Sequence, residues 1–467
     1  MPYVATSVAD LLQHLAGIAH IADDRLAIDD EARFRSQAAA DLAWTASFTQ
    51  DEPTADAVRW IVWEASQALG AHSASIEELY RARGRGEISG FTVPAVNIRA
   101  QTFDMARTFY AAAQKADVGT ILFELARSEQ TYTFQRPMDY ATSVLAGALA
   151  AGWSSPVFIQ GDHYQFNAKK YAADPEAMTE EIRRACRLAL DAGYRNIDID
   201  SSTLVDLSRE SLDAEQRDNY MRAAELSALI RSLETDGVAV SIGGEIGEVG
   251  KVNSTTAELK AYLEGYNQEL AARAPGARGL SKVSVQTGTS HGGVPLAGGG
   301  VAEVKLDFEV LRALGELARS YGLAGAVQHG ASTLPDELFH HFPTVETAEI
   351  HLATGFQNAL YDHPAFPKAL MEEIYAWCQV NAADERKDGQ TEDQFLYTTR
   401  KKAIGPFKRA LWDLETKDEI LASQGAKMAY LFDQLKVPGS MQHVERYIKP
   451  VPVARPIPAA LKAAVVG

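Results

Sequence analysis

The chain is poor in cysteine, in positive charge and in long apolar runs, and each shortage excludes a class of protein. It has 467 residues and two cysteines, Cys186 and Cys378, so we expect a reducing compartment, the cytoplasm, and no disulfide framework. Lys and Arg number 45 against 62 Asp and Glu, and the net charge of −17 argues against nucleic acid or an anionic membrane as a partner. No apolar run approaches the roughly 18 residues of a membrane span, and residues 1–20 lack the features of a secretory signal.

Nucleotide-binding fingerprints are also missing. The first strand-like run is not followed by Gly-x-Gly-x-x-Gly, which disfavours a dinucleotide-binding fold. The glycine clusters at 243–244 and 298–300 lack the spacing of a phosphate-binding P-loop. A small anionic substrate stays possible, because a metal ion and backbone amides can bind an anion locally.

The chain divides into three parts by pattern. Residues 1–88 look helical and lack strand signals, with a capped start at Ser7, an amphipathic helix over 55–69, and Trp44, Trp60 and Trp63 as packing anchors. Residues 89–370 alternate short strand-like runs with helix-like segments, and residues 371–467 combine helices, a polar loop over 381–394 and an extended tail. We interpret the first part as a packing or oligomer-forming extension and expect a homo-oligomer, a dimer or a tetramer.

Eight strand-like runs in the middle part predict the fold. They span residues 91–97, 118–124, 156–160, 196–200, 238–242, 282–286, 325–328 and 348–352. Eight parallel strands with intervening helices favour a closed (β/α)8 TIM barrel of the α/β class over an open sheet.

The ends of these strands carry metal-binding and acidic side chains. In a barrel they converge on one face, where barrel enzymes have their active sites. Three histidines, His163, His291 and His329, would suit Zn²⁺ or a similar divalent ion with a position open for substrate. Such an ion polarises a carbonyl, and carboxylates beside it orient ligands and transfer protons. The acidic residues at the same strand ends are Asp162, Asp200, Asp206, Glu245 and Glu248.

Each feature has a plainer interpretation. A single histidine at a strand end is more often hydrogen-bonded than metal-bound. Asp198 and Asp200 alternate with apolar residues and share a face, so one of them could be a barrel-interior salt-bridge partner. Glu248 could be a solvated loop residue, and the basic cluster at residues 400–402 favours a solvated helix face over a phosphate clamp.

Several motifs, in order, resemble the class II, metal-dependent ketose-bisphosphate aldolases, which include fructose- and tagatose-bisphosphate aldolases. They are Asp162-His163, Gly244-Glu245-Ile246-Gly247, Gly288-Thr289-Ser290-His291-Gly292 and His329-Gly330-Ala331-Ser332. The strand at 91–97, the serine-rich segment at 201–208 and the last strand at 350–354 are also similar to family segments. The resemblance covers roughly residues 80–360.

The resemblance implies a TIM barrel in carbohydrate metabolism, such as glycolysis. By this resemblance, the protein would reversibly cleave a ketose (bis)phosphate to dihydroxyacetone phosphate and an aldehyde through a metal-stabilised enediolate. By resemblance, His163, His291 and His329 would hold Zn²⁺, and Glu245 with Asp206 or Asp200 would serve a displaced or second position. The resemblance also allows a second divalent cation, or a monovalent cation, in addition to Zn²⁺.

The resemblance also implies roles for residues that contact substrate. Asp162 would act as acid or base at the hydroxyl beside the bond being cleaved, and Glu248 would handle the proton of dihydroxyacetone phosphate. The residues expected to hold a phosphate, through backbone N–H groups and hydroxyls, are Gly292, Gly330, Ser332 and Thr354.

The sequence departs from the family pattern at His351, where the family usually has an asparagine that contacts the enediolate. The histidine could alter substrate choice, add a metal ligand or mark loss of the usual activity. Two alternatives therefore stay open. One is another metal-dependent barrel enzyme, an epimerase or a hydrolase, and the other is a non-catalytic aldolase-like partner subunit.

Overall fold

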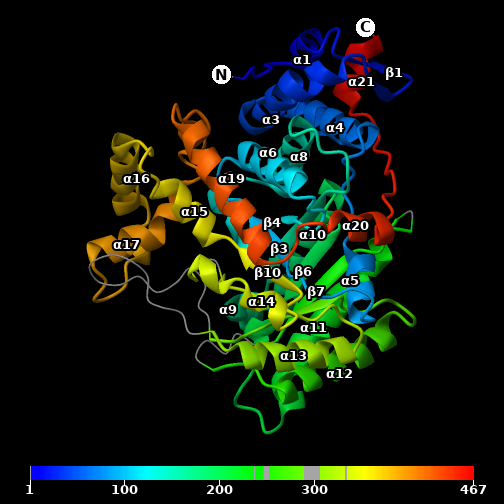
Figure 1. Ribbon diagram of the computed structural model, residues 1–467, viewed down its shortest axis with the longest axis vertical. Coiled ribbons are helices and arrows are strands. Elements are labelled where there is room, and N and C mark those ends of the chain that lie inside the picture. Colours follow the sequence, from blue (N-terminus) through cyan, green and yellow to red (C-terminus); the bar gives the residue numbers. More distant parts are fainter. Residues whose placement is uncertain (1, 236, 247–251, 289–305, 332–333, 467) are drawn as a thin grey trace.

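Eight parallel strands close into a barrel at the centre of the computed structural model, which describes residues 2–235, 237–246, 252–288, 306–331 and 334–466 (Figure 1). Each strand pairs with its neighbours in the chain, and the last, β10, closes the barrel against the first, β3. The strands are β3 (Val93–Asn97), β4 (Leu122–Ala126), β5 (Phe158–Gln165), β6 (Asn196–Asp200), β7 (Ser241–Glu245), β8 (Lys282–Val285), β9 (Ala326–Gln328) and β10 (Glu349–Leu352). The predicted (β/α)8 barrel is confirmed, since each strand overlaps one predicted run.

Helices cover the outside of the barrel, and α10 (Pro175–Ala192) shows how an apolar stripe packs one of them against it. In α10, the buried residues Met178, Ile182, Cys186 and Ala189 recur at helical spacing, and Asp174 caps the first turn. The other helices between or after the strands are α6 (Thr102–Lys115), α7 (Arg127–Thr133), α8 (Pro137–Ala150), α9 (Ala168–Ala173), α11 (Leu212–Leu233), α12 (Thr256–Arg273), α13 (Phe308–Ser320), α14 (His341–Thr344) and α15 (Thr354–Tyr361).

The N-terminal extension is mainly helical, as predicted, but the expectation that it lacks strands is wrong. Strands β1 (Ala19–Ala22) and β2 (Arg25–Ile28) form an antiparallel hairpin. Its two turn residues, Asp23 and Asp24, have left-handed φ angles of 52° and 58°, the backbone that a tight hairpin turn requires and that Asp tolerates. The helices are α1 (Val8–His14), α2 (Glu31–Arg33), α3 (Ala39–Phe48), α4 (Glu52–Ala68) and α5 (Glu77–Gly84).

The C-terminal part returns to the N-terminal extension, so both ends of the chain lie at one end of the molecule (Figure 1). The predicted extended tail is only partly correct, because residues 459–466 form a helix, α21, in which Leu461 is fully buried. The predicted loop at 381–394 also contains a helical turn at 383–385 and the start of α17. The remaining helices are α16 (Lys368–Asn381), α17 (Glu392–Thr399), α18 (Lys408–Trp412), α19 (Lys417–Gln434) and α20 (Met441–Tyr447).

The sequence argued against disulfides and against membrane spans, and both expectations can be compared with the described residues. Cys186 and Cys378 are both free and buried, which agrees with the expectation that they form no disulfide. Among the described helices, none has the length and apolar character needed to span a bilayer.

Candidate active site

A bulge in β5 positions two consecutive site residues. Gly161 pairs with Ile197 and Tyr164 with Ile199, so Asp162 and His163 together face one residue of β6. Successive residues of a regular strand point to opposite faces, but the extra residue lets both side chains line the same cavity. His163 has a left-handed φ of 42°, which is unusual for a residue with a Cβ. The sequence predicted that Asp162 and His163 follow the third strand. In the structure they lie inside β5, at its bulge.

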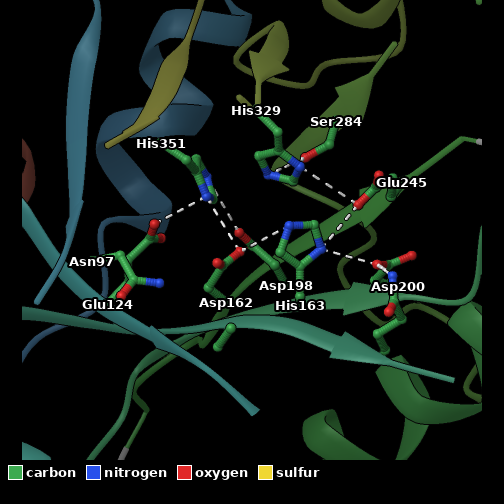
Figure 2. Close-up of polar contacts among 12 residues, drawn as sticks. Asn97, Glu124, Asp162, His163, Asp198, Asp200, Glu245, Ser284, His329 and His351 are labelled. Carbon is green, nitrogen blue, oxygen red and sulfur yellow. Dashed lines mark hydrogen bonds and ion pairs between the residues drawn. The ribbon is translucent and has the colours of Figure 1, made fainter. Parts of the chain in front are cut away.

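Two histidines and a glutamate meet at the mouth of the barrel (Figure 2). The rings of His163 and His329 are 4.3 Å apart between centroids. Glu245 Oε2 lies 3.5 Å from His163 Nδ1 and 3.7 Å from His329 Nδ1. The Oγ of Ser284 lies 3.3 Å from His329 Nε2, which helps to fix that ring. Strands β5, β7 and β9 therefore bring predicted metal ligands together.

Asp200 contacts the same histidine from β6. Its Oδ2 is 2.9 Å from His163 Nδ1, and its Oδ1 accepts a hydrogen bond of 2.6 Å from Ser202 Oγ. Burial by itself would lower the pKa of His163, but the surrounding carboxylates, Asp162 foremost, raise it well above its usual value. Burial by itself would raise the pKa of Asp200, but its contacts with His163 lower it. This field of negative charge favours any cation at the site.

Asp206, which the resemblance implied as an alternative to Asp200, lies elsewhere. Its carboxylate accepts a hydrogen bond from Ser208 Oγ and pairs with Arg209, and its side chain is 44% exposed. A short helical turn at 202–204 separates Asp206 from the end of β6. The expectation of Asp206 as a metal ligand is therefore wrong for this structure, and Asp200 is the aspartate at the histidines.

Two of the four residues expected to hold a phosphate, Gly330 and Thr354, lie in the described part of the chain. Gly330 and Thr354 line the cavity that also contains Asp162, His163, Glu245 and His329, a space of about 310 Å³. Gly330 has a φ of 69°, which a residue without a Cβ adopts at little cost. Four other predicted site residues, Glu248, His291, Gly292 and Ser332, lie outside the described residues.

His351 lines the cavity and lies among buried carboxylates (Figure 2). Its Nδ1 is 3.1 Å from Glu124 Oε1 and 3.2 Å from Asp162 Oδ1. On its other side, Nε2 is 2.7 Å from Glu349 Oε1. The ring centroid of His351 is 4.2 Å from that of His329, so the departure from the family pattern adjoins the predicted metal ligands.

A lysine inside the barrel balances part of this negative charge. Lys282 Nζ lies 3.0 Å from Asp198 Oδ2 and also pairs with Glu349. Burial tends to raise the pKa of Glu349, but Lys282 lowers it to about 2. Burial raises the pKa of Asp198 to about 6 despite the same lysine. Burial and then the Asp162 carboxylate raise the pKa of Glu124 to about 7. The salt-bridge interpretation of Asp198 is thus confirmed.

Two cationic side chains line the cavity as well. Arg99 pairs with Glu129 at 2.7 Å and donates to Gln357 Oε1 at 2.8 Å. Lys401 reaches the cavity from the C-terminal part, and burial, followed by the nearby Arg99, lowers its pKa. Arg400 is only 3% exposed and pairs with Asp362. The prediction of a solvated face at residues 400–402 is therefore wrong for Arg400 and for Lys401.

Sequence reasoning missed several residues of this site, namely Glu124, Gln160, Lys282, Glu349, Arg99 and Lys401. One sequence pattern could have revealed some of them. Polar residues two positions apart on an otherwise apolar strand lie on the same face, and in a barrel that face can point inward. Glu349 and His351 on β10 follow this pattern and point into the barrel together. Lys401 had no such signal, since its place depends on how the C-terminal part folds over the barrel.

The described donors fit a divalent metal ion. The ligand atoms of Asp162, His163 and His329 lie within 4.8 Å of one another, and so do those of His163, Asp200 and Glu245. Imidazole and carboxylate donors of this kind, with room left for a substrate, are typical of catalytic metal sites in enzymes. The fold and the site thus define a TIM-barrel enzyme with a potential metal centre.

The family is then clear from comparison. Residues 84–408 match the family described as fructose-bisphosphate aldolase class II, and the chain belongs to that family. Membership of this family, which is generally metal-dependent, supports a lyase-type enzyme with an aldolase-type function. No curated protein matches the chain.

The chain is similar to several solved structures at low sequence identity. A probable tagatose 6 phosphate kinase from Sinorhizobium meliloti 1021 is 16% identical, with a TM-score of 0.52, over 80% of this chain and 97% of that one. The fructose-bisphosphate aldolase of Campylobacter jejuni is 17% identical, with a TM-score of 0.46, over 79% and 97%. A putative fructose-1,6-biphosphate aldolase from Coccidioides immitis is 17% identical, with a TM-score of 0.44, over 78% and 96%. The first of these supports the fold alone.

Proposed function

We propose that the chain reversibly cleaves a phosphorylated ketose to dihydroxyacetone phosphate and an aldehyde, with Zn²⁺ as its cofactor. The observation that carries the proposal is the meeting of His163, His329 and Glu245 beside Asp162 in one cavity. We propose these three residues as ligands, together with His291. When bound, Zn²⁺ would polarise the substrate carbonyl and stabilise negative charge on its oxygen.

The chain's own residues would move protons and hold the substrate. Asp162 is 4% exposed and lines the cavity, so its carboxylate would take the proton of the hydroxyl beside the breaking bond and return it in the reverse direction. Glu248 is our candidate for the proton of dihydroxyacetone phosphate.

The phosphate would lie where cations and polar backbone groups face the cavity. Arg99 and Lys401 supply positive charge, and Gly330 and Thr354 supply a backbone approach and a hydroxyl. The contact of Arg99 with Thr354 Oγ1 at 3.4 Å connects the guanidinium to the start of α15. These groups would offset the strongly acidic charge of the whole chain near the substrate.

The test is release of triose phosphate by the purified chain from fructose and tagatose bisphosphates, measured with and without Zn²⁺. We expect release that a chelator abolishes and Zn²⁺ restores. The His329→Ala variant should lose both zinc and activity, while the surface variant His20→Ala, at a side chain that is 57% exposed, should keep both. Zinc-independent release, or unchanged zinc and turnover in His329→Ala, would contradict the proposed centre.

A negative result with both sugars would separate the alternatives. Zinc that is bound through His329 without any triose phosphate release would favour another metal-dependent reaction, such as epimerisation or hydrolysis. Failure to bind zinc or to cleave either sugar, even after reloading with metal, would favour a non-catalytic subunit. Either outcome would overturn the aldol cleavage proposed here.

A further inference from the structure

His351 contacts carboxylates through both nitrogens of its ring. Its Nε2 lies 2.7 Å from Glu349 Oε1. Its Nδ1 lies 3.1 Å from Glu124 Oε1 and 3.2 Å from Asp162 Oδ1 (Figure 2). An ionised carboxylate has no proton to donate, so each ring nitrogen carries a proton when it contacts one favourably. His351 is therefore a cation held between acidic side chains.

The surroundings of His351 favour this positive charge. Burial by itself would lower the pKa of His351, but Glu124 and then Asp162 raise it well above its usual value. Asp198 Oδ2 lies 3.7 Å from Nε2, so four carboxyl groups face the ring. Attraction of this kind is strong because only 5% of the His351 surface is exposed to screening solvent.

Glu349 gives the ring of His351 a fixed base. The Tyr80 hydroxyl donates to one oxygen of the Glu349 carboxylate, and Lys282 pairs with the other. Gln160 Nε2 also donates to Glu349 Oε1, at 2.9 Å. Glu349 is fully buried and does not line the cavity, so it has no access to a substrate. Any effect of Glu349 on the reaction therefore passes through the side chains that it holds.

Asp162 receives its contact with His351 from a distant part of the barrel. The two residues lie on β5 and β10, which two other strands, β3 and β4, separate. The bulge in β5 interrupts the regular backbone pairing at Asp162, so contacts of the side chain help to fix its carboxylate. His351 Nδ1 and His163 Nε2 lie 3.2 Å and 3.7 Å from the same oxygen, Asp162 Oδ1. That oxygen is therefore held between an expected metal ligand and His351.

We propose that His351 positions the Asp162 carboxylate for proton transfer, and that Glu349 fixes His351 in turn. The proposal rests on the proposed aldol cleavage, in which Asp162 is the acid or base. In this role His351 is a positioning residue, because it acts on the reaction through another side chain. The role would differ from that of the family's usual asparagine, which contacts the enediolate.

The competing explanation is direct contact between His351 and the substrate, since His351 lines the cavity. A double variant separates the two explanations. If His351 acts only through Asp162, replacing His351 costs nothing more once Asp162 has been replaced. If His351 contacts the substrate by itself, the two losses multiply.

Turnover, KM and zinc content are measured on the full chain loaded with Zn²⁺, with the bisphosphate sugar that the wild type cleaves. The variants are His351→Gln, Glu349→Gln, Asp162→Asn and the double variant that combines His351→Gln with Asp162→Asn. The matched control is His14→Gln, the same exchange at a histidine that also pairs with an aspartate. His14 Nε2 lies 2.8 Å from Asp41 Oδ2 in the N-terminal extension.

We expect His351→Gln to lower kcat roughly 10–100-fold with little change in KM, because a displaced catalytic group loses rate without losing substrate. Glu349→Gln should lower kcat by a smaller factor, since the His351 ring stays in place with a weaker partner. The double variant should be no slower than Asp162→Asn. Zinc content should stay at the wild-type level in His351→Gln and Glu349→Gln, and His14→Gln should keep wild-type turnover.

Three results would overturn the proposal. Losses that multiply in the double variant, or a loss that lies in KM, would assign His351 to the substrate. Loss of zinc in His351→Gln would assign it to the metal. Wild-type turnover in His351→Gln and in Glu349→Gln would show that Asp162 is positioned without either. Thermal unfolding identifies a variant that does not fold, and Glu349→Gln with its own Asp162→Asn double variant then replaces His351→Gln.

The contact itself is tested without any activity, by nitrogen NMR of protein labelled at histidine. The His351 signals, identified by their loss in His351→Gln, should shift in Asp162→Asn and stay unchanged in Asp206→Asn. Unshifted signals in Asp162→Asn would overturn the contact. A wild type that releases no triose phosphate would overturn the proposed function instead, and the spectrum alone would then decide whether His351 holds Asp162.

Discussion

The mouth of the barrel and the contact between the two ends of the chain are both buried, but different interactions hold them. At the mouth, carboxylates and histidines crowd together with Lys282 as a buried counter-charge. At the ends, the rings of Trp60 and Trp63 on α4 donate to the backbone of the extended tail, to Arg455 O at 3.1 Å and to Val453 O at 2.8 Å. We call this second region the terminal clasp, formed by Trp60, Trp63 and Gln67 with residues 453–455.

The terminal clasp contributes to stability, whereas the barrel mouth has features that a catalytic site needs. The terminal clasp satisfies the polar groups of Trp60, Trp63 and Gln67 with neutral hydrogen bonds to the tail, and its single charge, Arg455, lies against the Trp63 ring, so no like charges are crowded within the clasp. The barrel mouth buries several like charges close together, an arrangement that costs stability unless cations offset it. A fold selected only for stability would not need that arrangement, so the cost indicates a site for chemistry. The predictions below test this division, from the largest expected effect to the smallest.

Asp162→Asn should produce the largest loss. Removal of a positioned acid–base group lowers turnover by roughly 10²–10⁴-fold, and the near-isosteric amide should leave the fold intact. The measurement is the rate of triose phosphate release at saturating metal, with thermal unfolding as a check. The control is Asp206→Asn at the exposed aspartate, which should keep near-normal turnover. Near-normal turnover in Asp162→Asn would remove Asp162 from proton transfer, and a large loss in Asp206→Asn would return Asp206 to the site.

Lys282→Met should destabilise the barrel by about 3–5 kcal/mol, because it leaves two buried carboxylates without their counter-charge. The measurement is the free energy of unfolding in urea. The surface variant Lys462→Met, at an ion pair that is 54% exposed, should change it by less than about 0.5 kcal/mol. Adding Asp198→Asn and Glu349→Gln to Lys282→Met should restore part of the loss. A Lys282→Met protein as stable as the wild type would mean that the carboxylates are neutral.

Lys408 tests the penalty of a single buried charge outside the barrel. It lies between the rings of Phe48 and Trp412 and donates to Phe134 O, and burial lowers its pKa to about 8. The unfolded chain, with an ordinary lysine pKa of about 10.4, binds more protons between pH 8 and 10.4, so stability rises with pH in that window. Relative to Lys408→Met, the wild type should gain about 2 kcal/mol in unfolding free energy between pH 7 and 9.5. A constant difference would show that Lys408 titrates normally.

Arg455→Leu should give the smallest effect and act on the terminal clasp alone. The Arg455 guanidinium lies 3.4 Å from the centre of the Trp63 ring, and a contact of this kind stabilises by about 0.5–2 kcal/mol. We expect a loss of that size in unfolding free energy and unchanged turnover. The control Arg455→Lys keeps the charge and should lose less. A large drop in activity in Arg455→Leu would show that the clasp influences the active site.

Much of the fold could be predicted because the strands alternate with helices in a regular pattern. The eight runs have the length and apolar character of buried parallel strands, and each overlaps an observed strand. The hairpin at 19–28 was missed because its turn uses two aspartates with left-handed backbone, which composition alone does not reveal. The helix at the end of the tail was missed because its stability depends on burying Leu461 against the N-terminal extension.

The candidate site could be predicted only as a set of residue types. Asp162, His163, Glu245 and His329 lie at or near the ends of strands, and the barrel brings such positions together. The sequence also placed His351 at the end of the last strand, but not its contacts with Glu124 and Glu349. Those contacts join strands that are distant in sequence, and their distances depend on how the barrel closes.

The sequence by itself determined the barrel, its strand order and the residue types at its mouth, because periodicity and local turn chemistry are encoded in neighbouring residues. Only the tertiary structure decided which carboxylates share a counter-ion, that Asp200 rather than Asp206 contacts His163, and that Lys401 enters the cavity. These outcomes depend on the burial and spacing of groups from different strands and from the C-terminal part. Electrostatic interactions of this kind change within a few ångströms, a scale that a linear sequence does not specify.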